Sequence, residues 1–290
     1  MKQHKKFLPL SGQEFFDYYA VLCYTELMEF YTLASSSSGN AALARHGDTA
    51  VLIDAGISTR RITLSLAQLG LTPDALRAVL ITHAHSDHVS ALATLSKKYG
   101  VPVFASRGTA QFLACPERVL HPFDPGDAFL IGGLEVRSFR TSHDAAGSVD
   151  YRLDCASGSL GLLTDTGYVT DEAAAALSGV DTLLLEANHD VETLQNGPYP
   201  YHLKRRVLGE QGHLSNEAAA EFALRCVMGG TRDILLAHLS AENNTPAMAE
   251  YAVARRLQAA GFSIRLGVAP RDRLSDVHTV DRVRNTRAAE

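Results

Sequence analysis

A histidine-rich segment placed directly after an apolar strand constrains the fold of this chain more than any other feature. The segment is Thr-His-Ala-His-Ser-Asp-His at residues 82–88, and it follows the apolar residues 78–81. Alternate residues of an extended chain face the same side, so His83 and His85 can reach one cation. A helix that begins at Ser86 would turn Asp87 and His88 towards a second cation. A lone histidine here would most often be a surface residue beside a helix cap, but four ligand-type side chains so close together predict a metal centre.

Further histidine and aspartate residues follow other apolar strands along the chain. They are Asp54 after residues 50–53, His143 after residues 134–139, Asp165 after residues 160–164 and His238 after residues 234–237. Active-site groups of layered α/β folds usually lie where a loop takes over from a buried strand. Any one of these residues alone would more often be a cap or a hydrogen-bonded polar group. Their shared position predicts that they meet along one edge of the fold.

The order of the expected elements predicts an α/β (α+β) fold, a four-layer αββα sandwich. Strands are expected at 41–54, 78–82, 101–105, 128–140, 149–163, 180–187 and 233–239. Helices are expected after Ser58 and at 87–99, 108–114, 171–178, 215–228 and 246–259. The strands from 128 onwards begin the second sheet, and helices cover the outside of both sheets. The metal centre would lie where the strand ends converge.

Length and composition favour one large domain. The chain has 290 residues with 46% hydrophobic content, enough for a full core, and no linker divides it. We assign residues 28–275 to the domain, residues 1–27 to a poorly ordered or misassigned N-terminal extension, and residues 276–290 to a polar tail. Met28 stands two residues before the first strand, which is expected at residues 30–34, so we hypothesise that it is the true start.

The chain lacks the signals of secretion and membrane insertion. The basic start is followed by Gln13, Glu14 and Asp17, which interrupt any apolar signal segment. The apolar runs are of strand length and interrupted by charge, so we expect no membrane partner. The four cysteines lie far apart and form no CxxC pair, which favours a reducing cytoplasm.

A second informative region lies between residues 186 and 216. It contains Gly-Pro-Tyr-Pro-Tyr-His-Leu-Lys-Arg-Arg at 197–206 and Gly-His-Leu-Ser-Asn at 212–216. Backbone N–H groups at the start of a helix opened by Ser215 favour an anion, and His213 can add a donor. The side chains suited to flanking phosphates or unpaired bases are Lys204, Arg205, Arg206, Tyr199 and Tyr201. The alternative is that the basic run is a solvated helix face and that Ser215 is only an N-cap.

Together these motifs resemble the metallo-β-lactamase superfamily, and within it the YycJ/WalJ-like nuclease subfamily. The matching segments are residues 33–40, 82–88, 141–144, 163–167, 186–190, 197–206, 212–216 and 238–244. Glu186 resembles the acidic motif of the nuclease branch, and residues 213–215 resemble its phosphate-binding His-x-Ser. One departure is Ser36, where glycine is expected in the opening loop.

The resemblance implies a role for each candidate residue. One cation would be held by His83, His85 and His143, and the other by Asp87, His88 and His238, with Asp165 bridging. Asp54 would lie behind the site and orient its ligands. Asp87 and Asp165 would position a hydroxide that bridges the metals, while His213 and Ser215 would bind a phosphate oxygen. Either His213 or a metal-bound water would donate a proton to the leaving oxygen. Nitrogen and oxygen ligands suit two divalent ions of zinc, manganese or iron, so the metal stays open.

The resemblance implies a metal-dependent hydrolase that acts as a 5′-to-3′ exonuclease on single-stranded nucleic acid, DNA in preference to RNA. Two alternatives remain: a small-molecule hydrolase such as a glyoxalase-type thioesterase, and a non-catalytic metal-binding protein. The basic, tyrosine-bearing segment favours the nuclease, because a thioesterase has no evident need of it. The formal net charge is −5 and the pI is near 6.2, so nucleic-acid binding must depend on local basic patches. The oligomeric state stays open.

Overall fold

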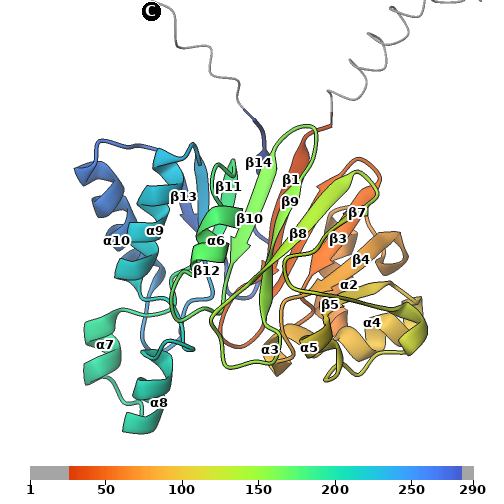
Figure 1. Cartoon of the computed structure of the whole chain (residues 1–290), viewed down its shortest axis with the longest axis horizontal. Coiled ribbons are helices and arrows are strands. Elements are labelled where there is room, and N and C mark those ends of the chain that lie inside the picture. The colour runs from red at the N-terminus through yellow and green to blue at the C-terminus, as the bar shows by residue number, and fades with distance from the viewer. Residues whose placement is uncertain (1–25, 283–290) are drawn as a thin grey trace, which may run out of the picture.

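Two seven-stranded sheets face each other, and helices cover their outer surfaces (Figure 1). The structure is a computed structural model that describes residues 26–282. The expected N-terminal extension and the hypothesis about Met28 therefore fall almost entirely on residues outside the described range. The αββα sandwich expected from the sequence is confirmed.

The first sheet comes mainly from the N-terminal half of the chain. Its strands are β1 (Met28–Ala34), β2 (Ala41–His46), β3 (Thr49–Ile53), β4 (Leu76–Ile81), β5 (Val103–Ser106), β6 (Leu120–Phe123) and β14 (His278–Val280), in the order β14-β1-β2-β3-β4-β5-β6. Strands β3 to β6 run parallel, so their carboxyl ends share one edge. The associated helices are α2 (Thr59–Gln68), η1 (Pro73–Ala75), α3 (Ser86–Val89), α4 (Leu92–Tyr99), α5 (Arg107–Ala110) and η2 (Glu117–Val119). Ser58 caps α2 as predicted, because its hydroxyl accepts a 3.4 Å hydrogen bond from the backbone N of Arg61.

The second sheet comes from the C-terminal half. Its strands are β7 (Ala128–Ile131), β8 (Leu134–Arg140), β9 (Val149–Asp154), β10 (Ser159–Leu163), β11 (Thr182–Glu186), β12 (Asp233–Ala237) and β13 (Arg265–Val268), in the order β13-β12-β11-β10-β9-β8-β7. Strands β10 to β13 run parallel, and their carboxyl ends lie at the same edge as the ends of β3 and β4. Helices α6 (Asp171–Ala176), α9 (Asn216–Met228) and α10 (Pro246–Ala259) pack on the outer face.

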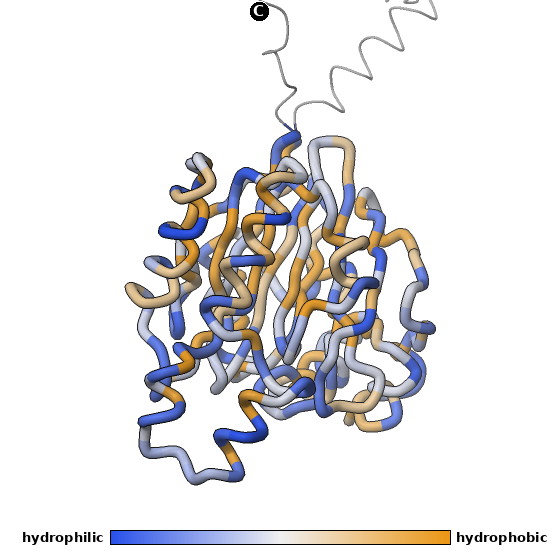
Figure 2. The backbone as a smooth tube through the Cα atoms, turned by 60° about the vertical axis from the view of Figure 1, so that its left-hand side comes forward, coloured by the Kyte–Doolittle hydropathy of each residue, from blue (hydrophilic) through white to orange (hydrophobic). Residues whose placement is uncertain are grey.

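Apolar side chains form three layers that hold the sandwich together. One layer lies between the sheets, and the other two lie under the helices on each side. Strand β1 illustrates the pattern: Phe30 belongs to the layer between the sheets, whereas Leu33 packs on the helix side. A strand that is buried on both faces has a nearly continuous apolar sequence. It therefore lacks the alternation of apolar and polar residues that identifies a half-buried strand. Figure 2 shows these hydrophobic stretches running through the middle of the molecule.

The single helix predicted for residues 87–99 is wrong in the structure, which has the two helices α3 and α4 there. The carbonyl of Asp87 accepts a 2.8 Å hydrogen bond from the backbone N of Asn40, and the N of Ala91 donates a 2.8 Å hydrogen bond to Ala55. In a continuous helix the backbone N of Ala91 would instead donate to the carbonyl of Asp87. The loops after β1 and β3 therefore break the helix beside the metal centre.

The chain returns to the first sheet near its C-terminus, inside the segment that we assigned to a polar tail. β14 pairs antiparallel with β1, with Met28 opposite Val280. His278 is buried, and its Nδ1 lies 2.8 Å from Oδ2 of Asp233 at the start of β12. The tail boundary at residue 276 is therefore wrong for residues 278–280, which join the two sheets at the edge opposite the metal centre. Strands β6, β13 and β14 were not predicted, because they are short and lack a clear alternation.

Helices α7 (Val191–Asn196) and α8 (Tyr201–Val207) form an arm that extends beyond the sandwich at the lower left of Figure 1. The side chain of Tyr201, at the start of α8, points to solvent and is 76% exposed. None of the helices within residues 26–282 has the length and apolar character that a membrane crossing requires.

Candidate metal centre

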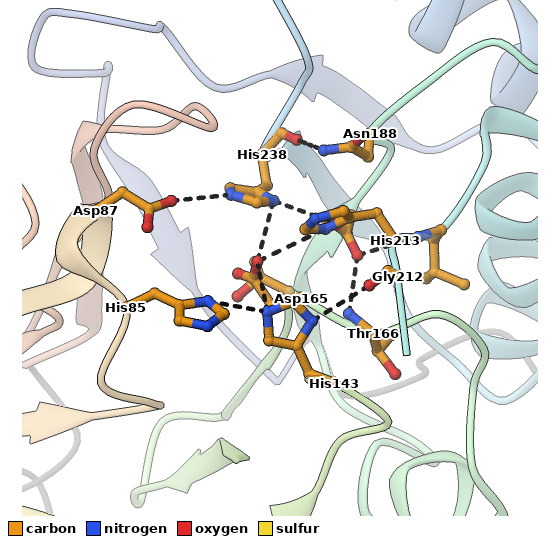
Figure 3. Close-up of polar contacts among 12 residues, drawn as sticks. His85, Asp87, His143, Asp165, Thr166, Asn188, Gly212, His213 and His238 are labelled. Carbon is orange, nitrogen blue, oxygen red and sulfur yellow. Dashed lines mark hydrogen bonds and ion pairs between the residues drawn. The ribbon is translucent and has the colours of Figure 1, made fainter. Parts of the chain in front are cut away.

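The predicted metal ligands meet where the carboxyl ends of strands from both sheets converge. His83, His88 and Asp165 are buried, as are His143 and His238. Figure 3 shows side chains from β4, β8, β10 and β12, or from the loops that follow these strands, turned towards one another. The structure therefore brings together all seven residues that the sequence proposed as ligands.

Three imidazoles form the first group of ligand atoms. Nδ1 of His85 lies 3.0 Å from Nε2 of His83 and 3.3 Å from Nε2 of His143. Burial, helped by the neighbouring His88, lowers the pKa of His83 well below its usual value, so its ring is neutral and keeps a lone pair. Converging imidazole nitrogens are a donor set that suits a divalent cation such as zinc.

A second group contains Asp87, His88 and His238. Oδ2 of Asp87 lies 3.6 Å from Nε2 of His88 and 3.8 Å from Nε2 of His238. Burial alone would lower the pKa of His238, but the carboxylates of Asp165, Asp87 and Glu186 outweigh it and raise the pKa to about 10. The surroundings of this imidazole therefore favour a positive charge, which either a proton or a metal ion can supply.

Asp165 lies between the two groups. Its Oδ2 is 3.3 Å from Nε2 of His88, and its Oδ1 is 3.8 Å from Nε2 of His143. Within the described residues, Oδ2 of Asp165 and Nε2 of His238 are buried atoms without a hydrogen-bond partner. Leaving a buried polar atom unsatisfied costs about 1–3 kcal/mol. These two atoms belong to the ligand groups, so the side chains fit divalent cations.

Asp54 sits behind the ligands and organises them. Its Oδ1 accepts a 2.9 Å hydrogen bond from the backbone N of Thr82, and its Oδ2 accepts one of 2.9 Å from the Thr82 hydroxyl. Oδ2 also lies 2.7 Å from Nδ1 of His88. This contact fixes the ring so that Nε2 faces the centre, as the sequence proposed for a residue in this position.

Three residues of the site adopt left-handed backbone conformations. The φ angles are 58° for Asp54, 51° for Asp165 and 55° for His238, and no other non-glycine residue within 26–282 has a positive φ. Such conformations cost of order 1–3 kcal/mol each and cluster at functional sites. Each follows a buried strand, so the strand ends turn sharply and present these side chains to one point.

Glu186 is fully buried and contacts two histidines of the site at once. Its Oε1 lies 2.8 Å from Nδ1 of His213 and 2.8 Å from Nδ1 of His238, while Oε2 accepts backbone hydrogen bonds from Thr166 and Leu214. Burial would raise the pKa of Glu186, but the two imidazoles lower it to about 2. The carboxylate is therefore ionised and fixes both rings. The sequence marked Glu186 only as part of a motif and gave it no role.

Two further polar residues were missed. Nδ2 of Asn40 lies 3.1 Å from Nε2 of His88. Oδ1 of Asp144 lies 3.4 Å from Nε2 of His143, and Oδ2 of Asp144 lies 2.6 Å from Nε of Arg206. The hydrogen bond from Arg206 lowers the pKa of Asp144. The sequence feature that could have identified them is their position in matched motifs, at residues 33–40 for Asn40 and at residues 141–144 for Asp144.

A cavity of about 210 Å³ opens over the ligand groups, and the residues proposed to bind phosphate differ in their relation to it. His213 and Arg206 line the cavity, as does Tyr199. The Ser215 hydroxyl accepts a 3.2 Å hydrogen bond from the backbone N of Ala218, which is the N-cap alternative.

Lys204 and Arg205 have other contacts. Nζ of Lys204 donates a 2.8 Å hydrogen bond to the carbonyl of Gln195, and the guanidinium of Arg205 lies 6.0 Å from the centre of the Tyr201 ring. Neither side chain lines the cavity. Within the basic run, Arg206 alone extends towards the ligands.

The chain is similar to known proteins in both sequence and fold. The sequence profile described as the beta-lactamase superfamily domain matches residues 49–239. Exodeoxyribonuclease WalJ of Streptococcus pneumoniae is 39% identical over 243 residues, which cover 81% of this chain and 90% of the relative. Exodeoxyribonuclease YycJ of Bacillus anthracis is 36% identical over 242 residues, which cover 82% and 92%. The crystal structure of the metallo-β-lactamase fold protein YhfI from Bacillus subtilis aligns with a TM-score of 0.66 at 16% identity, covering 86% of this chain and 99% of that chain.

Proposed function

This chain belongs to the metallo-β-lactamase superfamily and, within it, to the family of the exodeoxyribonucleases WalJ and YycJ, and we propose that it is a metal-dependent 5′-to-3′ exonuclease on single-stranded DNA. The observation that carries the proposal is the convergence of two ligand groups on Asp165 beside His213 and Arg206. DNA as the substrate is supported by the names of these relatives. Single-strand preference and polarity rest on the family resemblance alone. The cysteine pattern supports a cytoplasmic location.

We propose that the two ligand groups hold two divalent cations. His83, His85 and His143 would hold one, Asp87, His88 and His238 the other, and Asp165 would contact both. When bound, such a pair of cations supplies a nucleophile from water at neutral pH and offsets the charge of a phosphate. The nitrogen and oxygen donors suit zinc, manganese or iron.

We propose that His213 acts on the substrate itself. Its Nδ1 is engaged by Glu186 at 2.8 Å, so Nε2 is the ring nitrogen that remains for a ligand in the cavity. The carboxylate of Glu186 holds the ring in this orientation. Through Nε2, His213 would donate a hydrogen bond to a phosphate oxygen and deliver a proton to the departing oxygen.

In this proposal Arg206 binds the phosphate. Asp144 accepts from Nε at 2.6 Å and from one terminal nitrogen at 3.2 Å, which fixes the plane of the guanidinium. A fixed guanidinium loses less conformational freedom when it binds a phosphate. Asp144 also contacts His143 and so couples this phosphate contact to the first ligand group.

The proposal is tested by incubating Mn²⁺- and Zn²⁺-loaded protein with 5′-phosphorylated single-stranded DNA, single-stranded RNA and S-lactoylglutathione. We expect mononucleotide release from the 5′ end of the DNA and no comparable hydrolysis of the thioester. His213→Ala should lower kcat while the metal content stays unchanged, whereas Asp165→Ala should lose both. His202→Ala, an exposed histidine on the arm, is the matched control. Thioester hydrolysis without release of nucleotides would favour the thioesterase instead.

A further inference from the structure

A second cavity adjoins the cavity over the metal centre. It has a volume of about 260 Å³ and lies between the loop after β12, the start of α10 and the segment after β13. Ser240 lines both cavities, so they are neighbours on the same edge of the sandwich. The mechanism proposed above makes no use of this second cavity.

The walls of the second cavity combine apolar side chains with two cations. Leu239, Pro246 and Ala269 contribute apolar surface, and Arg271 and Arg273 contribute positive charge. Nη2 of Arg271 donates a 3.3 Å hydrogen bond to the carbonyl of Leu239, which holds this side chain at the wall. Within the described residues, no carboxylate lines the cavity, and no ion pair engages either arginine. Both guanidinium groups therefore keep donors for an anion from outside.

The cavity is connected to the metal centre through the backbone. The Ser35 hydroxyl accepts a 2.9 Å hydrogen bond from the N of His238, and the N of Ser35 donates a 3.2 Å hydrogen bond to the carbonyl of Pro270. Ser35 thus links the segment that carries the two arginines to the backbone of His238, a proposed metal ligand. The fourteen-residue helix α10 begins at the cavity with Pro246, so its positive end adds to the field there.

We propose that the second cavity is a nucleotide subsite for the strand whose scissile phosphate lies at the metal centre. The nucleobase would lie against the apolar wall, and the adjoining phosphate would be bound by Arg271 and Arg273. Two guanidinium groups suit a phosphate, and the local charge offsets the net charge of −5 that otherwise opposes nucleic-acid binding. This subsite rests on the proposed nuclease function and deepens it.

The test compares a double variant with a matched control on two substrates. The variant is Arg271→Gln with Arg273→Gln, and the control is Arg77→Gln with Arg118→Gln, two exposed arginines at or before the amino ends of β4 and β6. The substrates are a single-stranded DNA oligonucleotide and bis(p-nitrophenyl) phosphate, a small phosphodiester that reaches only the metal centre. We expect kcat/KM on the oligonucleotide to fall at least about tenfold more than on the small diester, and only for the test variant.

A scan of neutral linkages identifies the phosphate that is bound. A single methylphosphonate is placed in turn at each linkage near the 5′ end of the oligonucleotide. A methylphosphonate at one linkage should lower the activity of the wild type but have little effect on the test variant. The neutral linkage and the arginine substitutions remove the same contact, so their effects do not add. The dependence of log KM on log salt concentration should also become shallower by about 0.7, the value expected for the loss of one single-strand phosphate contact.

Three results would overturn the subsite. They are equal digestion of DNA by the test variant and the wild type, equal losses in the test and control variants, and equal losses on both substrates. A wild type that hydrolyses the small diester but digests no nucleic acid would instead remove the proposed function, and the subsite with it.

Discussion

Asp150 holds the backbone directly before Asp165, the proposed bridging ligand. Its Oδ2 accepts a 2.7 Å hydrogen bond from the backbone N of Thr164 and a 3.4 Å hydrogen bond from the Thr164 hydroxyl. Asp54 contacts Thr82 in the same way, directly before His83. Both aspartates line one small cavity between the sheets. Each sheet thus uses a buried carboxylate to fix the residue that precedes a ligand.

Replacing Asp150 should weaken both stability and metal binding. Asp150→Ala leaves the buried N–H of Thr164 without its acceptor, which should lower the free energy of unfolding by about 1–3 kcal/mol. The freed turn should also lower the affinity for metal about 10- to 100-fold. Urea unfolding and metal titration measure the two effects. Asp154→Ala on the same strand is the control, since Asp154 forms a surface pair with Arg152; equal effects in both variants would contradict the role of Asp150.

Neutralising Glu186 should affect His213 and His238 together. Glu186→Gln keeps the shape of the side chain but removes the charge that both Nδ1 atoms contact, so nuclease activity should fall about 10- to 100-fold. Activity on single-stranded DNA and metal content by mass spectrometry are the measurements. Glu192→Gln, an exposed change in α7, should leave both unaffected. Full activity in Glu186→Gln would show that the charge of Glu186 is not needed.

Removing metal should destabilise the whole sandwich, because the ligands come from both sheets. A cation that binds only the folded state adds about 2.7 kcal/mol at a free concentration of 100 times its Kd. Chelation should therefore lower the Tm by several degrees in scanning calorimetry. Asp165→Ala serves as the control, since its Tm should respond much less to chelator. An unchanged wild-type Tm after verified metal loss would contradict a site that links the sheets.

Cys226 should make the stability depend on pH in the alkaline range. Burial in α9 raises the pKa of its thiol to about 12, above the ordinary value of about 8.5 in an unfolded chain. Above pH 8.5 the unfolded state loses this proton while the folded state keeps it, so the free energy of unfolding falls by about 1.4 kcal/mol per pH unit up to about pH 12.

Urea unfolding of the wild type and Cys226→Ala across this range isolates the effect. The difference in the free energy of unfolding between the two proteins should change with pH by about 1.4 kcal/mol per pH unit. A difference that does not depend on pH would contradict the raised pKa of Cys226. Cys155→Ala, at a partly exposed thiol, controls for the loss of a cysteine.

The sequence was sufficient to predict the layers and which side chains meet at the site, but among the residues that hold those side chains it named only Asp54. His83, His143, Asp165 and His238 each follow a buried strand, and the parallel strand ends bring them together. Asn40 and Asp144 lie in matched motifs, but their partners His88 and Arg206 are distant in sequence, so the motifs gave neither residue a role. Asp150 lies in no matched motif, and its partner Thr164 is in the segment after β10. The break between α3 and α4 has the same cause, since the loop bearing Asn40 takes the carbonyl of Asp87.

Surface polar residues were the least predictable. Ser215, Lys204 and Arg206 lie in one short region, yet they differ in function by geometry: one caps a helix, one bonds to the arm and one reaches the cavity. The long side chains of lysine and arginine have several rotatable bonds, so each can reach partners in several directions. Sequence spacing therefore identifies the region but not which member faces the substrate.

The pairing of β14 with β1 and the contact between His278 and Asp233 bear on how the proposed nucleic-acid substrate reaches the ligand groups. The two sheets are fastened at the edge far from the ligands by this short strand and at the near edge by side chains from both halves. Separation of the sheets would have to break one of these two sets of contacts. The arm of α7 and α8 contributes Tyr199, Leu203 and Arg206 to the lining of the cavity over the ligand groups, so a shift of this arm would change the width of the cavity without breaking either set.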